Sequence, residues 1–316
     1  MKLLVASPWV NRIAEVLGPE FPEVEFIASE NPETLVDRAA EAEAAFGPIS
    51  PELFRAATNL RWIQSTSAGV EWMGRIPELA ETDVIVTNTR GAHASTIAEH
   101  AFGMLVFLAR GFNHLYESQK RREWQRPLVQ AGVGLAGGTM GVIGLGNIGR
   151  AVAKRAEAFD MHVIAVDVNE VPKPDYVAEV GRLDKMPDLM RRSDVVAVCT
   201  PITDETRGMI DEELLKLMKP SAYLLVLSRG GIIDEPTLAQ MLRDGELAGA
   251  GLDVTAVEPL PEDNELWDAP NIIITPHSSP SSSQTGNNVT AILRDNLRRY
   301  LNGEELTNQV DKQRGY

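Results

Sequence analysis

The sequence predicts an α/β protein built from two doubly wound parallel-sheet domains. Its 316 residues exceed what one ordinary hydrophobic core holds together, so two domains are expected. Short apolar runs alternate with helical patterns along almost the whole chain, which is typical of parallel strands joined by helical crossovers. A segment with four glycines, 127–138, separates two such series and is predicted to be a loop or linker.

The first series predicts a small open parallel sheet. Helical patterns at 32–40 and 51–56 lie between several of its strands. The predicted strands are 2–6, 24–28, 44–47, 62–65 and 84–87.

A long apolar helix, 97–108, is predicted to follow the first series. Thr96 and Glu99 form an S/T-x-x-E capping box just before its apolar run, and Gly111 marks its end. Because apolar residues cover much of its surface, we expect this helix to be buried between domains or between subunits.

The second series predicts six strands with helical segments between most of them, for example 148–159, 212–218 and 235–243. The predicted strands are 139–144, 162–167, 194–200, 222–228, 248–253 and 271–275. A last helix at 286–301 is expected to return to the first domain and make it discontinuous. Its apolar residues at helical spacing are Val289, Leu293, Leu297 and Tyr300.

The composition excludes several classes of partner. Hydrophobic residues make up 44% and charged residues 24% of the chain, which is ordinary for a globular protein. A net charge of −15 argues against nucleic acid or an anionic membrane as a partner. The longest apolar run, 101–109, is far shorter than the roughly 20 residues of a membrane helix. The single cysteine, Cys199, rules out an intramolecular disulfide, so a cytoplasmic protein is expected.

A glycine motif stands between an apolar strand and an apolar-periodic helix. This context predicts a dinucleotide site, with one glycine for the tight turn, one for backbone approach to the pyrophosphate and one for helix packing. The helix N-terminus supplies N–H donors and a positive dipole for the phosphates. The motif is Gly144-Leu145-Gly146-Asn147-Ile148-Gly149.

Asp167 ends the next predicted strand, 18 residues beyond Gly149, near the spacing of a ribose-binding acid. A carboxylate there accepts hydrogen bonds from the ribose hydroxyls and repels a 2′-phosphate. Val168 and Asn169 follow, without an arginine to bind that phosphate. The sequence therefore predicts NAD rather than NADP.

Polar side chains follow three strands of the second series. Arg229 comes after one strand, Asp253 and Glu258 after the next, and His277 after the last. Ligands of a doubly wound sheet bind at this carboxyl edge. Reduction of a ketone leaves an alkoxide that needs a proton, and His277 can donate it near neutral pH. Glu258 would favour the protonated ring, and Arg229 would bind a substrate carboxylate and polarise the keto oxygen.

These ordered motifs resemble the D-isomer-specific 2-hydroxyacid dehydrogenases over nearly the whole chain. The matching pieces are GVIGLGNIGRAVAKRAEAFDMHVIAVD, VVAVCTPITDETRGMI, LVLSRGGIIDEPTLAQML, GAGLDVTAVEPLP and NIIITPH. The resemblance implies a catalytic trio of Arg229, Glu258 and His277, and Asp253 near the nicotinamide carboxamide. It also implies contacts with the adenine side and phosphates from Thr200, Pro201 and Thr206.

The resemblance further implies a substrate loop at Ser67-Ala68-Gly69-Val70, whose backbone N–H groups would bind the carboxylate. It implies a Rossmann NAD-binding domain, 96–283, inserted into a smaller flavodoxin-like substrate domain, 1–95 plus 284–316. A two-fold homodimer through the region of the helix at 97–108 is expected, with no metal. The substrate would be a small 2-keto or 2-hydroxy acid.

The chain departs from the family pattern at two places. Glu71 stands where the family often has Asp, and six residues rich in serine, 278–283, follow His277 and leave substrate choice open. Glyoxylate or hydroxypyruvate reductases and broader 2-keto acid reductases stay open. Formate dehydrogenases carry Gln at the position of Glu258, and phosphoglycerate dehydrogenases often have an extra C-terminal domain. The alternative outside enzymes is a dinucleotide-sensing scaffold of the corepressor type on the same fold.

Overall fold

The computed structural model describes residues 1–6, 8–29, 32–47, 49–124 and 133–313. It confirms an α/β fold with two all-parallel sheets, one of five strands and one of seven. The chain divides into two compact units, Met1–His93 with Ser282–Tyr316 and Ala94–Ser281. The first half of the predicted glycine-rich loop, 127–138, lies outside the described residues.

The first unit contains the five-stranded sheet, in the order β2-β1-β3-β4-β5. All five predicted strands are present within one or two residues. They are β1 (Lys2–Val5), β2 (Glu25–Ala28), β3 (Ala44–Phe46), β4 (Trp62–Gln64) and β5 (Ile85–Thr87). The predicted helix at 32–40 forms a 3-10 helix, η2 (Pro32–Glu41), whereas the one at 51–56 is α-helical, α2 (Pro51–Ala56).

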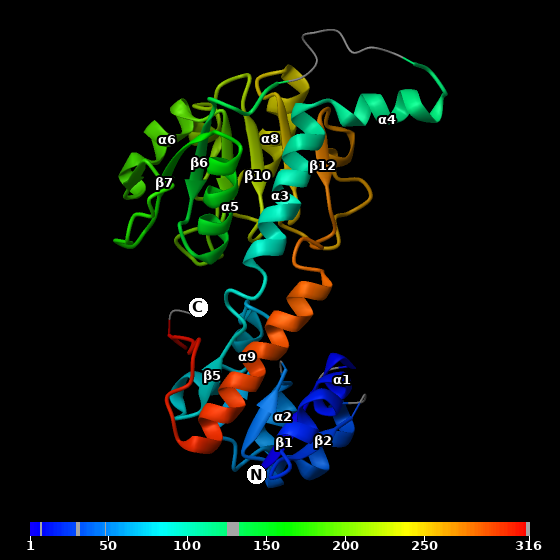
Figure 1. Cartoon of the computed structure of the whole chain (residues 1–316), viewed down its shortest axis with the longest axis vertical. Helices are drawn as coiled ribbons and strands as arrows, with labels where there is room; N and C mark the ends of the chain where they lie inside the picture. Colours follow the sequence, from blue (N-terminus) through cyan, green and yellow to red (C-terminus); the bar gives the residue numbers. More distant parts are fainter. Residues whose placement is uncertain (7, 30–31, 48, 125–132, 314–316) are drawn as a thin grey trace. The chain divides into compact units, whose positions relative to one another are not determined.

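Alternate residues of these strands enter two separate cores, as period-two side-chain alternation requires. Leu4 and Ile63 pack with η2, α2 and the 3-10 helices η3 (Glu71–Arg75) and η4 (Pro77–Glu81) on one face. Leu3 and Trp62 pack on the other face with α1 (Pro8–Leu17) and the last helix, α9 (Ser283–Asn302). Figure 1 shows α9, at the end of the sequence, lying against this sheet.

A buried polar network joins α9 to this sheet. The Asn296 amide donates to Oε1 of Gln64 and to the carbonyl of Thr307, and its own oxygen accepts from the Thr307 N–H and hydroxyl. Thr87 also donates to Gln64, and the Trp62 indole donates to Thr87. The buried polar side chains of this network thus have hydrogen-bond partners. These directional bonds fix the position of α9 on the sheet, in addition to its apolar contacts.

The second unit contains the seven-stranded sheet, in the order β12-β11-β10-β9-β6-β7-β8. Six of its strands were predicted: β6 (Thr139–Ile143), β7 (His162–Val166), β9 (Val195–Val198), β10 (Tyr223–Val226), β11 (Gly249–Leu252) and β12 (Ile272–Ile274). The edge strand β8 (Glu179–Gly181) was not predicted, because its three partly exposed residues form no apolar run.

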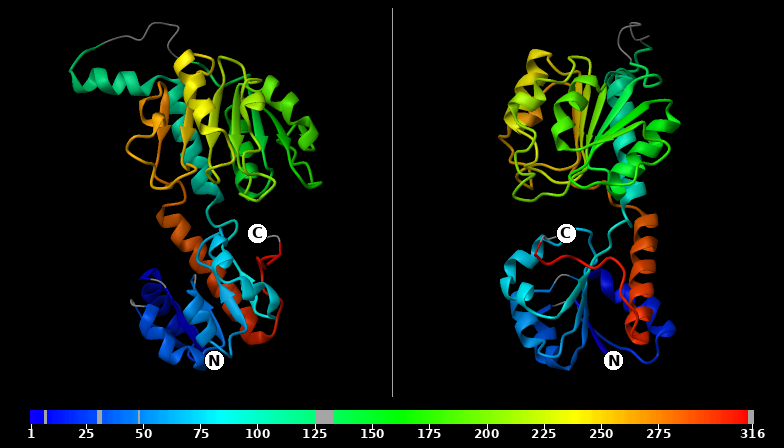
Figure 2. Two further views of the ribbon diagram at one scale, coloured as in Figure 1. Left: turned by 180° about the vertical axis from the view of Figure 1, so that it is seen from behind. Right: turned by 90° about the vertical axis from the view of Figure 1, so that its left-hand side faces the viewer.

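Helices cover both faces of this sheet, as Figures 1 and 2 show. Ile143 and Leu224 pack on one face with α6 (Met186–Arg192), α7 (Glu212–Leu215) and α8 (Glu235–Asp244). Their chain neighbours Val142 and Leu225 pack on the other face with α3 (Ala94–Ala109) and α5 (Asn147–Ala158). Because the five inner strands, β6, β7, β9, β10 and β11, are buried on both faces, each shows as a largely apolar run in the sequence.

Two expectations for helix α3 were wrong. The helix begins at Ala94, so Thr96 lies in its first turn and is no N-cap; instead Ser95 and Arg155 both donate to Glu99. Its apolar residues pack against α5 and the strands β10, β11 and β12 of the same unit. The burial of α3 therefore requires neither another domain nor another subunit.

A further helix, α4 (Phe112–Lys120), follows α3 after the left-handed Gly111 and was not predicted. Figure 1 shows it running away from the sheet of its unit. Among the described residues no helix is long and apolar enough to cross a membrane.

Candidate active site

The glycine motif forms the turn between β6 and α5, beside the point where the strand order reverses between β6 and β9. Gly144 has a φ of 90°, which favours glycine. A Cβ on Gly149 would lie 2.0 Å from the Gly144 carbonyl oxygen, whereas a Cβ on Gly146 would meet nothing within 4 Å. Gly149 therefore serves close packing, and Gly146 leaves open space at the helix N-terminus.

That N-terminus has the donors that a pyrophosphate needs. Gly146 is the N-cap, so no side chain caps α5, and Asn147 and Ile148 form its first turn. The first N–H groups of a helix have no partner within it, and they favour an anion.

Asp167 follows β7 and is buried. Its Oδ2 accepts from the Leu145 N–H and its Oδ1 from the Asn169 N–H, both at 2.8 Å. Each carboxylate oxygen can accept a second hydrogen bond, so the pair can still receive ribose hydroxyls. The carboxylate thus ties the glycine turn to the end of β7.

Among the described residues of the second unit, two buried hydroxyl groups have no hydrogen-bond partner, Oγ1 of Thr200 after β9 and Oγ of Ser228 after β10. Unpaired buried polar atoms are rare and indicate a missing partner. Nearby, the Thr206 hydroxyl donates to the carbonyl of Pro201 at 2.7 Å and holds the loop after β9. With the open Gly146, these groups fit a dinucleotide along this edge.

His277 and Glu258 meet at the same edge. Nδ1 of His277 lies 2.9 Å from Oε2 of Glu258, and both side chains are a little over one third exposed. His277 has a φ of 50°, a left-handed conformation that is unusual for a residue with a side chain. Its N–H donates to the carbonyl oxygens of Asp253 and Thr275, which hold that conformation.

The carboxylate of Asp253 anchors the turn that carries His277. It accepts from the Thr275 hydroxyl and from the N–H groups of Ser278 and Ser279, and its side chain is fully buried. The contact with the nicotinamide carboxamide implied by the resemblance stays a prediction. The first serines of 278–283 therefore serve this turn, and Ser282 caps α9 by accepting from the Thr285 N–H.

His100 on α3 belongs to the same network and was not singled out from the sequence. Its Nε2 lies 2.9 Å from Oγ1 of Thr275 and 3.7 Å from Oδ1 of Asp253. Nothing local in the sequence identifies it, because it lies 175 residues before Thr275 in an apolar helix.

Arg229 stands after β10, between the strands that precede Thr200 and Asp253. It is half-buried, and its Nη1 donates to the carbonyl of Ser228 at 2.7 Å. Parallel neighbouring strands bring Arg229, Glu258 and His277 to one edge of one sheet. Within this trio, Glu258 and His277 are in direct contact.

The predicted substrate loop lies in the first unit, after β4. The Ser67 hydroxyl donates to the Gly69 carbonyl, and the Asn88 amide donates to the Ala68 carbonyl. Within the described part of the chain, the N–H groups of Ala68 and Gly69 donate no hydrogen bond. This loop can therefore present N–H groups to an anion.

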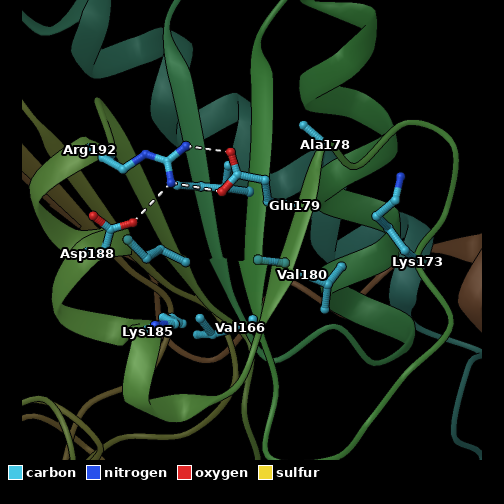
Figure 3. Close-up of a pocket in the computed structure, with 12 residues that line it drawn as sticks. Val166, Lys173, Ala178, Glu179, Val180, Lys185, Asp188 and Arg192 are labelled. Carbon is cyan, nitrogen blue, oxygen red and sulfur yellow. Dashed lines mark hydrogen bonds and ion pairs between the residues drawn. The ribbon is translucent and has the colours of Figure 1, made fainter.

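A separate pocket lies between β7, β8 and α6 (Figure 3). Three of its charged residues pair with one another, since Arg192 donates to both Glu179 and Asp188. None of the predicted site residues lines it. In the described ranges no cluster of three or more His, Cys, Asp or Glu residues could hold a metal ion.

Comparison with known proteins identifies the family. The model described as "D-isomer specific 2-hydroxyacid dehydrogenase, NAD binding domain" matches residues 102–279. A glyoxylate reductase of Korarchaeum cryptofilum is 32% identical, over 88% of this chain and 86% of that protein. A glycerate dehydrogenase of Methylorubrum extorquens is 33% identical, over 89% of each chain.

Comparison with solved structures gives the same family. A D-isomer specific 2-hydroxyacid dehydrogenase family protein from Aeromonas salmonicida has a TM-score of 0.87 and 30% identity, over 98% of this chain and 99% of that one. The chain therefore belongs to the D-isomer specific 2-hydroxyacid dehydrogenase family, whose members are oxidoreductases acting on a CH–OH group.

Structural relatives have been solved with either nicotinamide dinucleotide. An enzyme of the same description from Lactobacillus delbrueckii, in an NAD complex, has a TM-score of 0.79 and 26% identity, over 98% of this chain and all of that one. One from Xanthobacter autotrophicus, in complex with NADPH, has a TM-score of 0.82 and 26% identity, over all of this chain and 99% of that one.

Proposed function

We propose that the protein reduces a small 2-keto acid to the D-2-hydroxy acid, or catalyses the reverse, with NAD as cofactor. The observation that carries this proposal is the 2.9 Å contact between His277 and Glu258 at the carboxyl edge of the seven-stranded sheet. Bound NADH would supply the hydride. Because Glu258 engages Nδ1, Nε2 of His277 is the nitrogen that can give a proton to the substrate oxygen.

The other groups bind and orient the substrate. Arg229 would bind the carboxylate and polarise the keto oxygen, and the loop Ser67-Ala68-Gly69 would offer N–H groups to the carboxylate. A positive side chain is needed locally, because the chain as a whole carries a charge of −15. The unpaired hydroxyls of Thr200 and Ser228 would receive hydrogen-bond partners from the dinucleotide.

The names of the relatives favour a two- or three-carbon substrate such as glyoxylate or hydroxypyruvate. The test is NADH oxidation with a panel of glyoxylate, hydroxypyruvate and longer 2-keto acids. Turnover that is fastest with the short acids supports the proposal. Binding of NADH without turnover of any acid in the panel would favour the dinucleotide-sensing scaffold instead. We place this activity in the cytoplasm, as expected of a chain with one cysteine.

The cofactor preference is expected to favour NADH over NADPH. The Asp167 carboxylate repels a 2′-phosphate, and the exposed Val168 beside it offers no hydrogen bond. We expect kcat/KM to be at least about tenfold higher with NADH, which corresponds to about 1.4 kcal/mol. Equal kcat/KM values with the two cofactors would contradict the assignment of Asp167.

The protein is expected to form a homodimer through the region of α4. Phe112 and Tyr116 lie one turn apart on α4 and are 45% and 55% exposed, and Trp124, four residues after the helix, is 95% exposed. We expect a second copy to cover these side chains. Light scattering should give twice the 34.6 kDa chain mass at micromolar concentration. The double variant Phe112→Ser, Tyr116→Ser should shift to the monomer, whereas the control Trp267→Ser, at an exposed tryptophan elsewhere, should not. A monomeric wild-type protein would contradict this prediction.

A further inference from the structure

Glu235 is a buried carboxylate that the proposed mechanism does not use. It is the first residue of α8, and only 9% of it is exposed. Carboxylates are common in the first turn of a helix, where they interact with the helix dipole. The N-terminus of α8 is already stabilised by Asp234, whose side chain caps the helix by accepting from the Thr237 N–H at 3.0 Å.

The Glu235 side chain instead reaches two loops of the candidate active site. Its Oε1 accepts from the Ala256 N–H at 2.6 Å, and the backbone N–H of Gly231 is near enough to the carboxylate to favour its charged form. Gly231 belongs to the loop after β10 that carries Arg229. Ala256 belongs to the loop after β11 that carries Glu258.

The two loops touch at the point that Glu235 bridges. A Cβ on Gly230 would lie 1.9 Å from the carbonyl oxygen of Thr255 and 2.5 Å from the nitrogen of Ala256. Backbone atoms at this distance leave no room for a side chain. A small displacement of one loop would therefore also move the other. Attachment of both loops to Glu235 would prevent such a displacement.

A short series of contacts leads from Ala256 to His277. The Thr255 N–H donates to Oε1 of Glu258 at 3.2 Å, and the Thr255 hydroxyl donates to the carbonyl of Val257 at 2.9 Å. The other oxygen of Glu258 contacts His277. The loop held by Glu235 thus fixes the direction of the Glu258 carboxylate.

A carboxylate is a costly group at this position. Burial raises the pKa of Glu235, the N–H groups of Ala256 and Gly231 lower it, and the negative charge of Glu258 raises it further. A glutamine would have nearly the same size and would avoid both the burial of a charge and the repulsion from Glu258. A backbone N–H bonds more strongly to an anion than to an amide oxygen, so a carboxylate holds Ala256 more firmly than a glutamine would.

We propose that Glu235 is a positioning residue, which holds the Arg229 loop and the Glu258 loop in register and thereby sets the contact between Glu258 and His277. It acts through the backbone of Gly231 and Ala256 and touches no substrate. This proposal rests on the proposed roles of Arg229, Glu258 and His277.

The test compares Glu235→Gln and Glu235→Ala with the control Asp234→Ala, measured on the full chain with NADH and the best keto acid. We expect Glu235→Gln to lower kcat about tenfold and to raise KM, with the Kd of NADH unchanged. A displaced Glu258 loop also weakens the contact between Glu258 and His277, which stabilises the protonated ring. The pH above which reduction slows should therefore move to lower pH. Asp234→Ala should lower Tm and leave kcat and that pH unchanged, because it removes only a helix cap.

The proposal is overturned if Glu235→Gln behaves like Asp234→Ala, with kcat, KM and the pH profile all unchanged. It is also overturned if the Kd of NADH rises in step with the loss of rate, since the residue would then act on nucleotide binding. If Glu235→Ala does not fold, the nearly isosteric Glu235→Gln still decides. NMR titration of the His277 ring in wild type and Glu235→Gln gives a readout without turnover. A changed titration supports the positioning role even in a protein that proves inactive on every keto acid.

Discussion

Replacing His277 with alanine is expected to lower kcat for keto acid reduction by about 10²-fold or more, the loss that follows removal of a general acid. The side chain lies at the carboxyl edge of the sheet with Nδ1 held by Glu258, so its other ring nitrogen is the proton donor of the proposed mechanism. Steady-state rates with NADH and the best keto acid measure the effect. The Kd of NADH should stay within about twofold, because the glycine turn and Asp167 are untouched. A variant with wild-type kcat would remove His277 from the mechanism.

The variant Glu258→Gln is the matched control for this prediction. In the wild-type protein the Glu258 carboxylate stabilises the protonated imidazole of His277, which is the form that reduction consumes. Without the charge, the protonated form is lost at lower pH, so the high-pH limb of the rate profile should move to lower pH. If that limb stayed in place or rose, Glu258 would not be the partner of His277. Arg229→Ala should differ from both by damaging KM as well as kcat, because the same group binds the carboxylate and polarises the carbonyl.

Replacing Gly146 with alanine is expected to weaken NADH binding by about tenfold or more, with the fold intact. The new methyl group would meet no protein atom within 4 Å and would occupy the open space where the pyrophosphate is proposed to approach α5. Its backbone has a φ of −76°, which alanine adopts without strain. Fluorescence titration gives the Kd, and thermal unfolding should give an unchanged Tm. Unchanged NADH affinity would contradict the assignment of this space to the pyrophosphate.

The neighbouring variant Gly149→Ala is expected to act in the opposite manner. Its methyl group would lie 2.0 Å from the backbone carbonyl oxygen of Gly144, so α5 must move away from β6. Overpacking against a backbone atom should destabilise the fold by about 3 kcal/mol, seen as a lower Tm before any ligand is added. Equal Tm values for the two alanine variants would contradict the assignment of Gly149 to helix packing and of Gly146 to cofactor binding.

The strands were predictable because both sheets are parallel and covered on both faces. Runs such as Leu224 to Leu227 are then apolar at every position, and the sequence shows them without ambiguity. The edge strand β8 lacks that cover and was missed. The short 3-10 helices η3 and η4 were missed as well, because their packing depends on neighbours that are distant in sequence.

The candidate site could be predicted in part for a topological reason. In a doubly wound sheet, residues just after parallel strands share one edge, so strand ends alone bring Arg229, Glu258 and His277 together. The local order of residues carries no comparable information on contacts across the sheet. His100 was therefore not predicted, although it contacts Thr275.

The sequence by itself determined the fold class, every described strand except β8, and the glycine motif, and it supplied the residues proposed for hydride chemistry, because each of these depends on local periodicity or on strand ends. Only the tertiary structure decided where α3 buries its apolar surface, why the serines after His277 are needed, and that Glu235 turns inward to two loops. These features depend on atoms far apart in the chain. The choice between a solvated and a buried side chain is made by the packing around it, which no local pattern records.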